Sequence, residues 1–126
     1  MKRKTSLILL LSLIVSVMMA GCQKITSDVT VSDSDLVGRW AEEGTQVYWH
    51  FTGSHDGETW DEADDVHEGE DGSTHFTWSL SGSDVTCQMQ GQMGQVVPKV
   101  YTITSMGADS FTWRNSYGIS TTFIKK

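Results

Sequence analysis

Leu36-Val37-Gly38-Arg39-Trp40 and Val47-Tyr48-Trp49-His50-Phe51 are two short runs in which apolar and polar side chains alternate. A period of two residues is typical of a β-strand with one face on a core and the other in water. The alternation continues in further short runs, which clusters of Gly, Ser, Asp and Asn separate at spacings of about ten residues. No convincing helical period competes with it, and the sequence therefore predicts an all-β domain.

Eight strands are expected along this domain. They cover residues 36–43, 46–52, 57–63, 73–80, 84–90, 97–105, 109–115 and 119–125. The turns between them are short and contain Gly, Asp or Asn, which tolerate the backbone conformations of tight turns. Short connections favour antiparallel neighbours, and eight such strands form either two packed sheets or one closed barrel. The alternation alone does not distinguish these two arrangements.

The Gly-x-Trp run at Gly38 and Trp40, followed by an aromatic second strand and a Gly turn, resembles the lipocalin-like lipoproteins of Gram-negative bacteria. The resemblance continues through residues 101–103, 109–113 and 120–125, so it covers nearly the whole mature domain. It implies a small eight-stranded antiparallel up-and-down barrel of the calycin type. It also implies a barrel-end motif in which Trp40 packs across the closed end under a basic residue. Arg114 and Lys125 are both candidates for that basic residue.

Alternation then assigns the inner face of the barrel, with Trp40 taken as interior by the resemblance. The other inner residues are Leu36, Val47, Trp49, Phe51, Trp60, Phe76, Trp78, Leu80, Val85, Cys87, Met89, Tyr101, Ile103, Phe111, Trp113 and Phe123. An eight-stranded barrel is just wide enough to be filled by side chains or to hold one small ligand. Two functions are compatible with this composition.

The first function is a non-catalytic binding module that takes a small apolar or amphipathic molecule in its mouth. Its candidate contacts are Trp49, Trp60, Trp78, Tyr101 and Trp113. The second is a barrel filled by its own side chains, which contacts another envelope protein or a polysaccharide through its surface or an acidic loop.

The start of the chain predicts export and membrane anchoring. Residues 1–21 have a basic beginning and an apolar run too short to span a bilayer, which is the layout of a secretory signal. Met19-Ala20-Gly21-Cys22 resembles the lipobox of bacterial lipoproteins, which implies a Cys22 carrying acyl chains such as palmitate. Residues 22–34 are expected to form a flexible tether, and residues 35–126 the barrel. We expect the membrane to be a partner through Cys22, in a Gram-negative envelope and at the outer membrane.

The mature chain is acidic. Residues 1–21 contain three of the nine basic residues and none of the sixteen acidic ones, which leaves a net charge of −10. This charge argues against nucleic acid as a partner, because binding phosphates requires Lys and Arg.

If Cys22 is acylated, Cys87 has no disulfide partner. Its place on the apolar side of a strand predicts a buried, inert thiol.

Two clusters of polar residues are candidate sites of chemistry. Residues 56–71 hold nine acids and no Lys or Arg, which indicates a solvated loop rather than a Ca²⁺ site, since EF-hand spacing is absent. The four histidines, His50, His55, His67 and His75, match no zinc-type spacing. His50 and His75 are expected on outward strand faces. No catalytic residue, metal site or cofactor is predicted, and the protein is not expected to be an enzyme.

Overall fold

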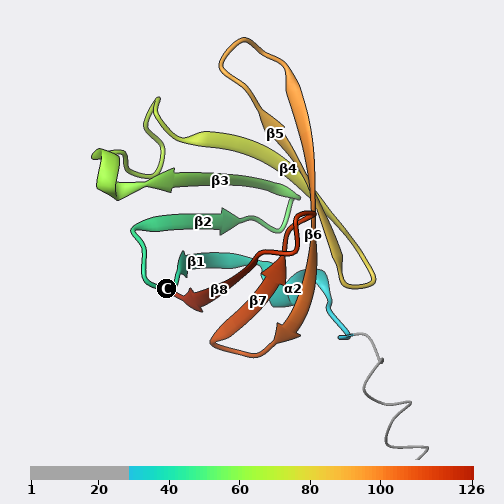
Figure 1. Cartoon of the computed structure of the whole chain (residues 1–126). Helices are drawn as coiled ribbons and strands as arrows, with labels where there is room; N and C mark the ends of the chain where they lie inside the picture. The colour runs from blue at the N-terminus through green and yellow to red at the C-terminus, as the bar shows by residue number, and fades with distance from the viewer. Residues whose placement is uncertain (1–28) are drawn as a thin grey trace, which may run out of the picture.

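The computed structural model describes residues 29–126, which form a closed barrel of eight antiparallel strands (Figure 1). The strands are β1 Gly38–Glu42, β2 Val47–Phe51, β3 Asp56–Asp61, β4 Thr74–Ser81, β5 Asp84–Gln90, β6 Val96–Met106, β7 Ser110–Arg114 and β8 Ser120–Lys125. Each strand pairs with the next, and β8 pairs back to β1 with Trp40 opposite Lys125. The predicted all-β up-and-down barrel is thus confirmed. The expected signal peptide and the Cys22 anchor lie outside the described residues.

Aromatic side chains fill the barrel interior. The buried core consists of Leu36, Trp40, Trp49, Phe51, Phe76, Trp78, Val85, Cys87, Ile103, Phe111, Trp113 and Phe123. The ring of Trp49 meets that of Trp113 edge-on, with 5.1 Å between centroids, and Phe111 stacks on Phe123 at 4.6 Å. Such pairs add about 0.5–1.5 kcal/mol each to the effect of area burial. Except for Trp60, every residue assigned to the inner face is buried in this core or packs against it.

The expected inner position of Trp60 is wrong. Tyr48 lies opposite Trp60 and Trp49 lies opposite Thr59, so Trp60 is on the outer face of the sheet, where its ring stacks on that of Tyr48 at 5.7 Å. The inner positions of β3 instead carry small residues. A Cβ atom on Gly57 would collide with the ring of Phe76 on the next strand, so the missing side chain makes room for that ring.

The domain also begins earlier than residue 35. Leu36 ends a single-turn helix, α2, at Asp33–Leu36, rather than beginning a strand, and it is fully buried. Val29 and Val31 pack against the same core, within the segment expected to be a tether. The Asp33 carboxylate lies 2.7 Å from Nε2 of His55. Residues 29–36 therefore cover the end of the barrel where β1 begins, which we call the closed end.

At the opposite end, β6 is much longer than β7. Pairing with β7 starts at Thr102, opposite Arg114, while β6 extends back to Val96 and pairs there only with β5. The β5–β6 hairpin consequently projects beyond the other strands (Figure 1). One side of β6 is therefore left without a neighbouring strand over residues 96–101.

Candidate functional site

The closed end is held by the Gly-x-Trp motif and by Lys125. The Trp40 indole N–H donates to the Leu36 carbonyl at 2.8 Å, and Lys125 Nζ lies 4.4 Å from the centroid of the Trp40 ring. The same ammonium donates to the Val37 carbonyl at 3.0 Å. Of the two candidate basic residues, Lys125 and not Arg114 therefore covers the tryptophan.

Gly38 is required by this arrangement. Its φ of +136° is a conformation that residues with a side chain rarely adopt, and a Cβ there would lie 2.5 Å from Lys125 Nζ. The closed end is thus a structural motif in which the Trp40 indole and the Lys125 ammonium already have partners.

Four of the five predicted ligand contacts lie in the interior and touch one another directly or through Phe51. Tyr101 stacks on Trp113 at 4.0 Å, Trp113 meets Trp49 at 5.1 Å, and Phe51 lies between Trp113 and Trp78. The buried side chains Trp49, Trp78 and Trp113 are at most 7% exposed, so they form packed core. Tyr101 is only partly buried and lies closest to the open end.

Glu42 points into the barrel from β1, since it lies opposite Phe123. Its carboxylate accepts a hydrogen bond from the Trp49 indole at 2.9 Å. Burial raises the pKa of Tyr101 to about 12, and electrostatic interaction with Cys87 and Glu42 adds to the shift. Tyr101 is therefore a neutral phenol at physiological pH, and the interior beside it holds a carboxylate.

A pocket lies at the side of the barrel. We call it the seam pocket: it has a volume of about 480 Å³ and lies between the unpaired side of β6 and the β7–β8 turn. Its lining residues are Val97, Pro98, Lys99, Val100, Tyr101, Asn115, Ser116 and Tyr117. Pockets for small ligands occupy about 300–1,000 Å³ and combine apolar walls with a few polar groups. The seam pocket fits that description.

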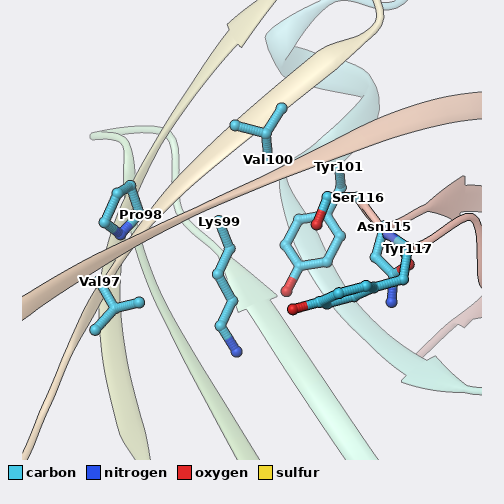
Figure 2. A pocket seen from close by; sticks show the side chains of 8 residues that line it. All are labelled: Val97, Pro98, Lys99, Val100, Tyr101, Asn115, Ser116 and Tyr117. Atoms are coloured by element: carbon cyan, nitrogen blue, oxygen red, sulfur yellow. Dashed lines mark hydrogen bonds between the residues drawn. The ribbon is translucent and has the colours of Figure 1, made fainter.

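Side chains from both faces of β6 line this pocket, because it lies along the edge of the strand. Figure 2 shows Val97, Lys99 and Tyr101 on one side of the strand and Pro98 and Val100 on the other. The ring of Tyr117 reaches from the β7–β8 turn toward Tyr101, and the two phenol oxygens lie next to each other in the view, beside the Lys99 side chain (Figure 2).

Of these lining residues, sequence reasoning identified only Tyr101. Lys99 and Tyr117 were missed because the pocket depends on where β6 loses its partner, which periodicity does not report. Two signals were present in the sequence: Pro98, which is typical of an edge strand, and the apolar pair Tyr117 and Ile119 in and beside a turn. Tyr117 is 88% exposed, an unusual position for a large aromatic side chain.

The predicted burial of Cys87 is confirmed. Its side chain is fully buried, and desolvation raises the pKa of the thiol to about 12, against a small lowering by Lys99. A thiol in this state is not a nucleophile at neutral pH.

The acidic run is only partly the solvated loop expected from its charge. Glu68 returns to the outer face of the barrel, where its two carboxylate oxygens accept hydrogen bonds from Arg39 at 2.8 and 2.9 Å. Nδ1 of His50 lies 3.0 Å from the same carboxylate. The hydrogen bond from Arg39 lowers the pKa of Glu68, and burial opposes that effect. Asp64 and Asp65 remain exposed.

The histidines do not converge. His50 and His75 lie on the outer face, as predicted, opposite Arg39 and Glu58 respectively. Across residues 29–126, His, Cys, Asp and Glu nowhere form a group of three that could hold a metal ion.

Within residues 29–126, no helix is long and apolar enough to cross a membrane.

Comparison with known proteins identifies the family. A family model described as a lipocalin-like domain matches residues 22–113, which includes Gly38, Trp40 and all strands from β1 to most of β7. No curated protein and no solved structure shows a significant match. The family match and the closed eight-stranded barrel agree, and β8, beyond the matched residues, completes the barrel. The chain therefore belongs to the family of lipocalin-like domains.

Proposed function

We propose that the protein is an exported, lipid-anchored binding module that takes a small apolar or amphipathic molecule and performs no catalysis. Lipocalin-like proteins are generally non-catalytic binding proteins, which supports this function. The observation that carries it is the seam pocket, where apolar walls surround one ammonium and two phenols.

The proposed site differs from the one expected in the barrel mouth. The interior tryptophans pack against one another, so they support the pocket rather than line it; Trp113 does so by stacking beneath Tyr101 at 4.0 Å. Truncating such a core residue costs about 3–5 kcal/mol of stability. Loss of binding in those variants would therefore not identify a contact, and the lining residues of the pocket are the ones to change.

Cys22 is the proposed lipid anchor, and the outer membrane of a Gram-negative envelope the proposed location. Two or more acyl chains suffice for stable attachment to a bilayer. The described residues begin at the closed end, beside α2, whereas the seam pocket lies toward the other end.

Native mass spectrometry tests this function. Residues 23–126 contain the whole barrel and can be exported through a cleavable signal without the lipobox. We expect a stoichiometric adduct that is lost on denaturation. Ser116→Trp places an indole in the pocket and should remove the adduct, whereas Ala108→Trp, in an exposed turn between β6 and β7, should keep it. An adduct equally abundant in both variants would contradict the assignment to this pocket.

A second function has one observation in its favour, namely the aromatic filling of the interior. In that case the barrel would contact an envelope protein or a polysaccharide through its acidic surface. Replacing Asp61, Asp64 and Asp65 by Asn should then abolish recovery of a partner from envelope extracts. Recovery unchanged by these substitutions would argue against this function.

A further inference from the structure

We infer that the seam pocket selects a single amphipathic molecule with an anionic group, which Lys99 pairs with at the open side of the barrel. This inference rests on the proposed function and specifies its ligand. Lys99 is the one charged residue among the eight that line the pocket, and none of them is acidic. In a mature chain with sixteen acids and six bases, a pocket lined in this way is locally cationic.

Lys99 is available to a ligand. Three of the other four basic side chains of residues 29–126 have partners: Arg39 binds Glu68, Lys125 covers Trp40, and Lys126 lies 5.4 Å from the Tyr48 ring centroid. The fourth, Arg114, does not line the pocket. Within residues 29–126, Lys99 makes no hydrogen bond or ion pair to another side chain. The phenol oxygens of Tyr101 and Tyr117 lie beside the Lys99 side chain in the same pocket, where their O–H groups can donate to an anion held by the ammonium (Figure 2).

The interior carboxylate sets the orientation of the ligand. Glu42 lies inside the barrel, bonded to Trp49, and its charge contributes to the raised pKa of Tyr101. An anion placed beside Glu42, at the open end of β1, would be repelled, whereas one at Lys99 is attracted. The apolar part of the ligand then lies against Val97 and the tyrosine rings, on the same side of β6 as Lys99.

A peptide strand is a poorer occupant of the same edge. The Ile103 N–H donates to the Ser83 carbonyl at 2.8 Å, and the Gln95 carbonyl accepts from the Gly91 N–H at 2.8 Å. The backbone groups of odd-numbered residues along this strand therefore point toward β5. The even-numbered residues face the open edge, and one of them is Pro98, which has no N–H to donate. A proline at this position is a device that prevents strand addition.

Calorimetric titration of residues 23–126 with probes of one chain length tests the inference. The probes are decanoate, decanol and decyltrimethylammonium, with acetate as the free anion and phosphatidylglycerol vesicles as the lipid surface. We expect decanoate to bind about tenfold more tightly than decanol, as a hydrogen bond to a charged group predicts. Acetate and vesicles should bind much more weakly than monomeric decanoate.

Variants at position 99 separate charge from shape. Lys99→Gln should weaken decanoate about tenfold and leave decanol unchanged, while Lys99→Arg retains binding. Arg114→Gln, on the outer face of β7, removes the same charge outside the pocket and should have no effect.

The outcomes distinguish the two proposals. Equal binding of decanoate and decanol, or unchanged binding of decanoate in Lys99→Gln, overturns the anionic selectivity and leaves the pocket itself standing. Binding to vesicles alone, or acetate as tight as decanoate, overturns the choice of a single amphipathic molecule. Failure of every probe to bind defeats both this inference and the proposed binding function.

Discussion

The closed end and the seam pocket differ in how completely their groups find partners. At the closed end, the Trp40 indole donates to the Leu36 carbonyl and the Lys125 ammonium donates to the Val37 carbonyl. The ammonium also covers the Trp40 ring. At the seam, β6 has an unpaired edge, Tyr117 is 88% exposed, and Val96, Val97, Val100 and Ile119 are also exposed. The difference indicates that one end of the barrel maintains the fold and the other is free to bind.

The largest expected effect is at the closed end. Trp40→Ala should lower the free energy of unfolding by about 3–5 kcal/mol, because it leaves a cavity under Lys125 and removes the bond to Leu36. Urea denaturation followed by circular dichroism measures the change. A loss below about 1 kcal/mol would show that this end does not hold the barrel together.

Lys125→Met should have a smaller effect, about 1–2 kcal/mol. It removes a hydrogen bond to the Val37 carbonyl and a cation–π contact with Trp40, while the methionine retains most of the apolar stem. Arg114→Met is the matched control on β7 and should change stability by less than about 0.5 kcal/mol. Equal effects of the two substitutions would contradict the assignment of Lys125 to the closed end.

The contact that holds the acidic loop on the barrel, between Glu68 and Arg39, should depend on pH. The free energy of unfolding should change less than in the two preceding variants. The pKa of Glu68 is lowered in the folded protein, so its contribution is present above the ordinary carboxyl value of 4.5 and is lost as the pH falls through the lowered value. Proton exchange at Nε of Arg39, followed by NMR, should accelerate on that acidification. In Glu68→Gln this step should be absent, whereas Glu70→Gln should preserve it.

The smallest effect on stability is expected at the seam. Tyr117→Ala removes a ring that is 88% exposed, so unfolding should change by less than about 0.5 kcal/mol. Affinity for decanoate should nevertheless fall, because the phenol and the ring line the pocket. Calorimetry and urea denaturation on the same variant separate the two effects. A variant that is destabilised yet binds normally would reverse the division of roles between the two ends.

Sequence alternation predicted the fold because a half-buried strand imposes a period of two. It failed in β3, where the inner positions are occupied by Gly57 and Thr59 and the large residue, Trp60, lies outside on Tyr48. Alternation reports that the two faces differ without stating which face is inner. At Gly57 the inner position is small because a side chain there would collide with the Phe76 ring. The single turn of α2 was missed because four residues are too few to show a helical period.

The seam pocket could not be predicted in the same way. It arises because Thr102 is the first residue of β6 to meet β7, at Arg114, and a strand register is a property of two segments together. Lys99 in the sequence is an ordinary strand lysine. Only the loss of the neighbouring strand turns it into the cation of a pocket.

The most direct test of the account is amide shift mapping by NMR on residues 23–126 as decanoate is added. The account predicts that the largest shifts fall on residues 97–101 and 115–117, with little change at the closed end around Trp40 and Lys125. Shifts concentrated on inward residues such as Thr59 and Phe76, with the seam unaffected, would show instead that the ligand enters the barrel interior and would contradict the account.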